Sequence, residues 1–309
     1  MPTASMLRIA WVAPASPMGT QVEVEQAKQW VEARYPCRIV YTPACYQSQS
    51  IEERTDQFLQ CALDPDIDGL WAVRGGEGSA DLIPHLISHK DALQALPPKW
   101  LLGFSDITAL LFFLSRHSHW QAIHGPCVKG FVSGRLNQPT MDSMQAWLSQ
   151  QAHEVMWSDL QPLNKAATQI SHLSAPMVAG NLTMVTLGVK DCWELDALGK
   201  MIVLEDVNEH PYAIARSLKY LQRVGVLQGA NALILGGFSQ HVNTQSPLAD
   251  ATTPDVLPCL RQFAKTCDYP VFISEHIGHG CDNVPVLINQ VATIRSNDGC
   301  IYLSYALTR

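Results

Sequence analysis

The stretch LLGFSDITALL, Leu101 to Leu111, predicts a short strand that turns directly into a helix. Residues 100–104 are mostly apolar, as is typical of a buried strand. Apolar side chains then recur at the spacing of one helical face, at Ile107, Leu110, Leu111 and Leu114. Ser105 therefore lies on a sharp turn, with Asp106 at the beginning of the helix. A serine in this position is either a helix cap or a nucleophile whose hydroxyl is exposed at the edge of a sheet.

The alternation of strand and helix extends over the first half of the chain. Strands are expected at residues 7–13, 37–43, 67–76, 100–104 and 121–126, and helices at 23–34, 51–62, 79–89 and 107–117. Strands separated by helices of this length form βαβ units with a parallel sheet. Sites on such sheets gather at the carboxyl ends of the strands. Both RGGEGS (residues 74–79) and GFSD (residues 103–106) come at such ends.

A polar segment without a clear period, residues 160–174, predicts the junction between two domains. We expect an N-terminal domain at 1–160, a linker at 161–174 and a C-terminal domain at 175–309. In the second half, strands are expected at 199–206 and 230–239, helices at 211–223 and 255–267, and a long polar loop at 240–253. Residues 284–307 alternate like a hairpin whose turn is at Asn297, Asp298 and Gly299.

Composition and charge argue against several classes of protein. The chain has 309 residues, of which 47% are hydrophobic, so it can bury sizeable cores. A formal net charge of −7 and the lack of a Lys/Arg cluster argue against nucleic-acid binding, which needs cations to displace counterions. No apolar run reaches the ~18 residues of a membrane span.

The cysteines and the N-terminus favour the cytoplasm. Nine cysteines are scattered along the chain without a C-x-x-C pair, which favours reduced thiols over a disulfide framework. The first apolar run, LRIAWVAPAS, is short and is closed by a Pro-Ala-Ser turn, so we expect a first strand there rather than a signal peptide.

The glycine-rich segment VRGGEGSADL could present backbone N–H groups to an anion. Gly75, Gly76 and Gly78 follow a strand and precede a helix, and glycine lets the backbone adopt the turns that such a loop needs. The segment lacks the third glycine of a dinucleotide fingerprint and the Lys-Ser/Thr of a P-loop. A tight turn without a ligand is an equally good interpretation. Around Ser105, the α/β-hydrolase pattern G-x-S-x-G fails because Ile107 stands at its last position.

A nucleophilic serine needs a base and an acid that orients the base. His279 follows a strand among glycines and is the better candidate base, whereas His124 is a weaker one. Glu205 ends the apolar strand MIVL and is the better candidate acid, because Glu209 is more typical of a solvated helix start. A zinc cluster at His276, His279, Cys281 and Asp282 matches no standard ligand spacing, so no metal is expected.

At this point several motifs together resemble one family. RGGEGS, LLGFSDIT, HGP, AGNLT, VLEDVNEHPYAIARSL, LILGGFS and GHG occur in the order and spacing of the LD-carboxypeptidases, serine peptidase family S66. The resemblance extends over almost the whole chain. It implies an α/β fold: a doubly wound parallel sheet in the N-terminal domain, similar to class I glutamine amidotransferases, followed by a smaller β-rich C-terminal domain.

The resemblance also implies the site and its chemistry. Ser105 would be the nucleophile, His279 the base and Glu205 the orienting acid, with the oxyanion held by the backbone N–H groups of Gly76 and Asp106. Arg74 and Glu77 would contact the substrate. Two residues depart from the family pattern. Glu77 replaces an aromatic residue in the glycine loop and Ala213 replaces an arginine, although Arg216 is kept. Both departures concern substrate preference.

The function implied is removal of the terminal D-alanine from murein tetrapeptides during peptidoglycan recycling, without a cofactor, by a cytoplasmic homodimer. The alternative within the family is hydrolysis of microcin C-type peptidyl or aminoacyl nucleotides. A binding protein that keeps the fold without turnover is disfavoured by the intact serine, histidine and glutamate. A cysteine-based amidotransferase would need cysteine where Ser105 stands.

Overall fold

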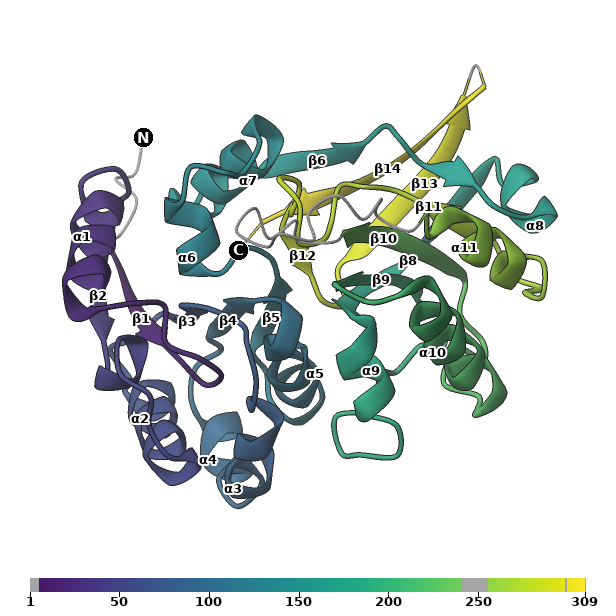
Figure 1. Cartoon of the computed structure of the whole chain (residues 1–309). Helices are drawn as coiled ribbons and strands as arrows, with labels where there is room; N and C mark the ends of the chain where they lie inside the picture. The colour runs from purple at the N-terminus through teal and green to yellow at the C-terminus, as the bar shows by residue number, and fades with distance from the viewer. Residues whose placement is uncertain (1–5, 240–254, 298, 309) are drawn as a thin grey trace, which may run out of the picture.

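Two β-sheets organise the chain, as Figure 1 shows for the computed structural model. The structure describes residues 6–239, 255–297 and 299–308. The polar loop predicted at 240–253 and the central residue of the predicted C-terminal turn, Asp298, lie outside the described residues. Within the described ranges, no helix is long and apolar enough to cross a membrane.

The first sheet has the strand order β12-β5-β4-β3-β1-β2. Five of its strands are parallel: β1 (Leu7–Val12), β2 (Cys37–Tyr41), β3 (Gly69–Ala72), β4 (Trp100–Gly103) and β5 (Gln121–His124). The order of these five strands is that of a doubly wound sheet whose direction of winding changes between β1 and β3. This confirms the predicted α/β fold class.

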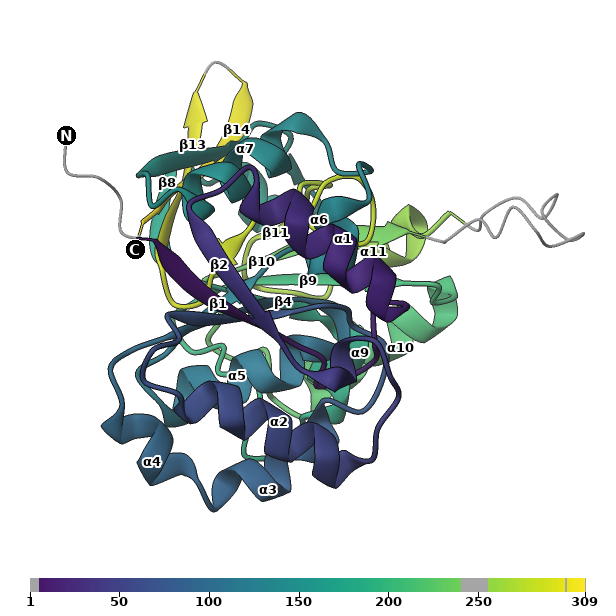
Figure 2. The same cartoon turned by 90° about the vertical axis from the view of Figure 1, so that its left-hand side faces the viewer.

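Helices cover both faces of the first sheet (Figure 2). One face carries α1 (Gln21–Glu32) and α6 (Val128–Val132), and the other α2 (Ile51–Leu63), α3 (Ile83–Ile87), α4 (Lys90–Ala95) and α5 (Thr108–His117). Two of these helices begin with capping boxes, in which Thr20 pairs with Glu23 and Ser50 with Glu53. These caps satisfy backbone N–H groups that a helix start leaves without partners.

The single helix predicted at 79–89 is wrong. A 3₁₀ turn, η2 (Ala80–Leu82), precedes α3, and α4 follows as a separate helix. Pro84 lies in the first turn of α3, where a missing N–H costs nothing, but it could not continue a helix that began at Ser79. The backbone at His89, with φ −109° and ψ 5°, then separates α3 from α4.

The second sheet has the strand order β6-β14-β13-β8-β9-β10-β11-β7. Its centre is parallel and consists of β8 (His172–Asn181), β9 (Met201–Val207), β10 (Ala232–Ser239) and β11 (Val271–Ile273). Antiparallel strands flank it: β13 (Val291–Asn297), β14 (Cys300–Leu307), β6 (His153–Trp157) and β7 (Gln161–Pro162). Its helices include α9 (Leu182–Leu187), α10 (Pro211–Arg223) and α11 (Leu257–Ala264).

The region around the predicted domain junction contains regular structure. Residues 161–174, expected to be a linker, form β7, α8 (Lys165–Thr168) and the beginning of β8. β6, which the sequence groups with the N-terminal domain, pairs with β14 of the second sheet, and α7 (Gln138–Leu148) leads into it. β7 and α8 are too short to show a periodic pattern of apolar residues from which they could be predicted. The boundaries at 160 and 175 stay a prediction.

One short strand joins the two halves. β12 (Val286–Leu287), from the C-terminal part of the chain, pairs antiparallel with β5 and extends the first sheet, so that Val286 lies opposite His124. The predicted hairpin therefore begins only at Val291. Because β12 runs against β5, the residues just before Val286 lie at the carboxyl edge of the first sheet, where Ser105 also lies.

The pairing of β12 gives a stability prediction. Leu287 is 1% exposed, so Leu287→Ala should lower the free energy of unfolding by about 2–5 kcal/mol through lost burial and a cavity. The same substitution at Leu198, which is 75% exposed, should change it by less than about 0.5 kcal/mol. Urea unfolding followed by tryptophan fluorescence measures both. Equal effects of the two substitutions would show that β12 contributes little to the fold.

Candidate active site

Ser105 lies on a strained turn between β4 and α5. Its φ is +62°, in the left-handed region that non-glycine residues rarely adopt. A 3₁₀ turn, η3 (Ser105–Ile107), connects it to α5. Gly75 packs against it so closely that a Cβ on Gly75 would lie 3.0 Å from the Ser105 Cβ and 3.1 Å from its Oγ. Ser105 is therefore not an ordinary N-cap, and strain of this kind is often found at functional residues.

The side chain of Asp106 ties the glycine loop to this turn. Its Oδ2 accepts a hydrogen bond from the Ser79 N–H at 2.8 Å, and the Ser79 hydroxyl donates to the Asp106 carbonyl at 2.5 Å. Burial raises the pKa of the Asp106 carboxyl, and the hydrogen bonds from Ser79 oppose that effect. Gly76, on the same loop, has a φ of +119°. The two segments with the predicted oxyanion donors are thus joined, while the donor role of Gly76 and Asp106 stays a prediction.

His279 and Glu205 form a buried pair. The Nδ1–H of His279 donates to Oε2 of Glu205 at 2.7 Å, and Glu205 is fully buried at the carboxyl end of β9. The carboxylate fixes the proton on Nδ1, which makes Nε2 the nitrogen that can exchange a proton with a reacting group. The ring of Phe104, next to Ser105, lies 4.7 Å from the His279 ring between centroids. His279 thus contacts the residue that precedes the predicted nucleophile.

Two opposing effects set the pKa of His279. Burial lowers it, because a charged imidazolium loses hydration. The Glu205 carboxylate, by its charge and its hydrogen bond, and the charge of Asp206 outweigh burial, so the net pKa lies above its ordinary value. His124, the weaker candidate base, differs: it is fully buried, and burial lowers its pKa to about 3. His124 is therefore neutral, and both its ring nitrogens are inaccessible to a substrate.

Three glycines place the segment that carries His279. The pairing of β9 and β10 shifts register between Leu235 and Phe238, at Gly236 and Gly237. The Gly237 N–H donates to the Ile277 carbonyl at 2.7 Å, and a Cβ on Gly236 would lie 2.9 Å from that same carbonyl oxygen. Gly278 has a φ of +149° and packs against Gly237. The LILGGFS and GHG motifs therefore lie in close contact, and a side chain at Gly236 or Gly278 would meet neighbouring atoms at 3.0 Å or less.

His276 lies in a separate environment from His279. Its ring stacks on Trp157 at 5.8 Å between centroids, and its Nε2 lies 3.3 Å from Oδ1 of Asp159. Cys281 is exposed, and no disulfide joins any of the nine cysteines. Among the residues that the structure describes, no group of three or more His, Cys, Asp or Glu side chains is arranged to hold a metal ion.

Arg74 and Glu77, predicted to contact substrate, are both exposed on the glycine loop. Glu77 is at the rim of a polar pocket whose other side chains include Ser16, Gln47 and Arg54. Arg54 is fixed there, since its Nη1 donates to the carbonyls of Pro14 and Ala15 at 2.7 and 2.8 Å. A charged side chain beside the predicted oxyanion loop can select substrates by charge, and this role for Arg74 and Glu77 stays a prediction.

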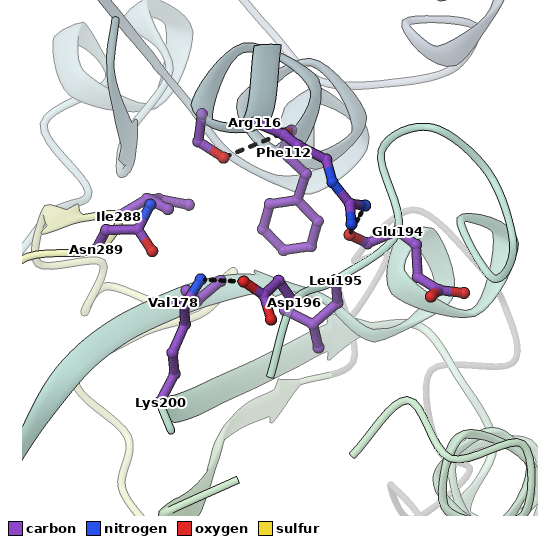
Figure 3. Close-up of a pocket in the computed structure, with 10 residues that line it drawn as sticks. Phe112, Arg116, Val178, Glu194, Leu195, Asp196, Lys200, Ile288 and Asn289 are labelled. Atoms are coloured by element: carbon purple, nitrogen blue, oxygen red, sulfur yellow. Dashed lines mark hydrogen bonds and ion pairs between the residues drawn. The ribbon is translucent and has the colours of Figure 1, made fainter. Parts of the chain in front are cut away.

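A second pocket lies at the other end of α5 and contains none of the three catalytic candidates (Figure 3). There the Arg116 Nη1 donates to the Glu194 carbonyl at 3.3 Å, and the Lys200 Nζ donates to Oδ2 of Asp196 at 3.0 Å. In Figure 3 the ring of Phe112 lies between these two hydrogen bonds. Arg116 and Lys200 therefore each have a hydrogen-bond partner within the protein.

Two residues that support the His279–Glu205 pair, Asn181 and Asp206, were not assigned this role from the sequence. Asn181 lies opposite Glu205 in the parallel pairing of β8 with β9, and its Nδ2 donates to Oε1 of Glu205 at 3.4 Å and to Oδ1 of Asp206 at 2.9 Å. Both residues stand in motifs that the sequence singles out, AGNLT and VLED. The sequence did not show that the two motifs lie on neighbouring strands, because β8 was not predicted.

Comparisons with known proteins agree with this architecture. Residues 9–125 match the family model of the LD-carboxypeptidase N-terminal domain, and residues 174–294 match that of the C-terminal domain. A Rickettsia conorii protein with carboxypeptidase in its name is 32% identical over 244 residues, 79% of this chain and 73% of its own. The murein tetrapeptide carboxypeptidase of Pseudomonas aeruginosa is 28% identical and covers 94% of each chain. The structure of muramoyltetrapeptide carboxypeptidase from Oxalobacter formigenes has the same fold, with a TM-score of 0.78, 24% identity and coverage of 96% of this chain and 98% of its own.

The positive φ of Ser105 can be tested without an activity assay. Ser105→Gly and Ser105→Ala both remove the hydroxyl, but only glycine adopts a φ of +62° without a steric cost. The glycine variant should therefore unfold with a free energy about 1 kcal/mol higher than the alanine variant. Urea unfolding of the two variants side by side measures the difference. An alanine variant at least as stable as the glycine variant would show that the turn is not strained.

Proposed function

The chain belongs to the LD-carboxypeptidase family of serine-type carboxypeptidases, and we propose that it removes the terminal D-alanine from murein tetrapeptides. The observation that carries the proposal is the buried hydrogen bond of 2.7 Å between His279 and Glu205, on a segment that lies beside the strained turn of Ser105. A base oriented by a carboxylate next to a serine is the arrangement that activates a serine for acyl transfer.

The relatives favour the murein substrate over the alternative. The Pseudomonas aeruginosa murein tetrapeptide carboxypeptidase is similar along 94% of the chain. The microcin C7 self-immunity protein of Escherichia coli is 35% identical, but over only 83 residues, 27% of this chain. The competing hypothesis for the substrate is therefore hydrolysis of a peptidyl or aminoacyl nucleotide, and the experiments below compare the two.

The proposed reaction proceeds through an acyl-enzyme. Nε2 of His279 takes the proton from Ser105 Oγ as the oxygen attacks the carbonyl carbon before the terminal D-residue. The backbone N–H groups of Gly76 and Asp106 hold the negative oxygen that forms. His279 then gives its proton to the leaving nitrogen, and free D-alanine departs. Water, deprotonated by His279, attacks the ester carbonyl; the bond from the carbonyl carbon to Ser105 Oγ breaks, His279 returns the proton to that oxygen, and the shortened peptide leaves.

We place this reaction in the cytoplasm, in peptidoglycan recycling, with a small peptide as the partner and a homodimer as the assembly. None of the proposed steps calls on a metal ion or an organic cofactor, because the serine, the histidine and the backbone N–H groups supply the nucleophile, the proton transfers and the oxyanion stabilisation.

The triad proposal predicts non-additive losses. Ser105→Ala and His279→Ala should each lower kcat by about a thousandfold or more, and the double variant should lose little beyond the worse single variant, because the residues act as a unit. Glu205→Gln should also reduce kcat strongly through loss of orientation. Release of D-alanine from a murein tetrapeptide measures all four variants.

His276→Ala is the matched control, since His276 is on the same segment but contacts Asp159 instead of Glu205. It should retain most of the activity. An inactive His276→Ala together with an active His279→Ala would overturn the assignment of the base.

Glu77 predicts a substrate preference. A murein tetrapeptide carries a diaminopimelate ammonium group next to the scissile bond, which a carboxylate at the rim of the site attracts, whereas a nucleotide conjugate carries an anionic group that it repels. Because Glu77 is exposed, the attraction is modest. Glu77→Gln should raise KM for the tetrapeptide about fivefold, change kcat less, and show a smaller effect at high salt.

Glu154→Gln provides the control for this experiment, because Glu154 is also exposed but is on β6, at the edge of the second sheet. Its KM should equal that of the unmodified protein. A Glu77→Gln variant with unchanged KM removes the argument for the ammonium group. Faster cleavage of a nucleotide conjugate than of any tetrapeptide would instead favour the microcin-type reaction.

A further inference from the structure

A second buried carboxylate, Asp206, lies next to Glu205 and has no part in the proposed reaction steps. It is 4% exposed. Its Oδ2 accepts hydrogen bonds from the Thr183 N–H at 3.0 Å and the Thr183 hydroxyl at 2.8 Å, and its Oδ1 accepts from Asn181 Nδ2 at 2.9 Å and from the Val207 N–H at 2.8 Å. No ion pair in the described ranges includes it. Four neutral donors thus hold a buried negative charge.

Asn181 connects this carboxylate to Glu205 of the proposed triad and to the helix that follows Ser105. Its side-chain amide donates to Asp206 at 2.9 Å and, at the longer distance of 3.4 Å, to Glu205. Its backbone N–H donates to the hydroxyl of Thr108 at 3.1 Å. Thr108 is the first residue of α5 and follows Ser105 by one helical turn. Through its hydrogen bond with Asn181, Asp206 can influence the position of the Glu205 carboxylate and of helix α5, which follows Ser105.

We propose that Asp206 is a positioning residue for the reaction: it fixes Asn181, and through it Glu205, and its buried charge favours the imidazolium form of His279. This inference rests on the proposed triad. On the plateau of the pH profile His279 is neutral in the free enzyme and becomes an imidazolium when it takes the proton of Ser105, so a charge that favours the imidazolium stabilises the transition state more than the ground state. Asp206 touches neither the substrate nor Ser105 in this account.

The groups that face His279 leave few other sources for such an effect. Among the described residues, the titratable groups whose charge acts on His279 include Glu205 and Asp206 from β9 and His124 from β5. His124 is neutral, since burial lowers its pKa to about 3. Burial lowers the pKa of His279 as well, and the two carboxylates reverse that shift. Glu205 is hydrogen-bonded to the imidazole, whereas Asp206 acts on it through its charge and can be removed separately.

The test removes the charge behind Glu205 in one variant and keeps it in another. Asp206→Asn removes one negative charge and should move the acidic limb of the kcat/KM profile down by about one pH unit, because His279 then loses its proton at lower pH. Its kcat/KM on the plateau should fall about tenfold. Asp206→Glu keeps the negative charge, so its limb should stay closer to that of the unmodified protein than the limb of Asp206→Asn. Asp159→Asn, which removes a carboxylate beside His276 instead, should leave the limb in place.

An NMR titration of the His279 imidazole in a Ser105→Ala background measures the same shifts without turnover. A purely structural role for Asp206 predicts lower activity with an unmoved limb and an unmoved titration, and that result would overturn the inference. Should Asp206→Asn fail to fold, Asp206→Ser, which is also neutral but smaller, carries the test, and an unmoved titration there also refutes the inference. Titration shifts in a protein that does not cleave tetrapeptides would support the role of Asp206 while refuting the proposed substrate.

Discussion

The antiparallel pairing of β12 with β5 is the contact on which the site depends. The candidate nucleophile belongs to the first sheet, whereas the candidate acid and base follow strands of the second. A catalytic arrangement divided in this way needs the two sheets to keep one relative position within a fraction of an ångström. The residues after His279 lead directly into Val286, which is hydrogen-bonded to the edge of the first sheet. The base is thereby anchored to both sheets.

The second constraint is the burial of charge. Glu205 and Asp206 are adjacent and both nearly inaccessible to solvent, and no lysine or arginine in the described part of the chain forms an ion pair with them. The protein compensates these charges with dipoles, through Asn181, Thr183 and backbone N–H groups, and with one titratable partner, His279. An arrangement of fixed dipoles needs little reorganisation when charge moves during a reaction. The free-energy cost of burying the two carboxylates therefore lowers the stability of the fold and does not add to the barrier of the chemical step.

Much of this arrangement could be predicted from local sequence patterns. The strands of the first sheet, the turn at Ser105 and the carboxyl-edge position of Glu205 follow from apolar runs and helical spacing, and the family resemblance added the roles. What failed were features decided by distant contacts. β12 looks like the beginning of a hairpin but pairs with β5, and β6 joins the strand that ends the chain. Pro84 breaks a helix that apolar spacing alone would continue. Asn181 is the clearest case, because its partners come from three separate segments.

The division of the site between early and late parts of the chain has a consequence for synthesis. The first sheet can begin to form as soon as β5 leaves the ribosome, but its last strand, β12, and the candidate base are made more than 150 residues later, after His124 and before the final hairpin. At about 5–20 residues per second, that interval lasts on the order of ten seconds or more. During this time the edge of β5 has no partner and the serine has no base. A nascent chain without the proposed base would be hydrolytically inactive, and its β5 edge would be exposed to mispairing, until Leu287 has been translated.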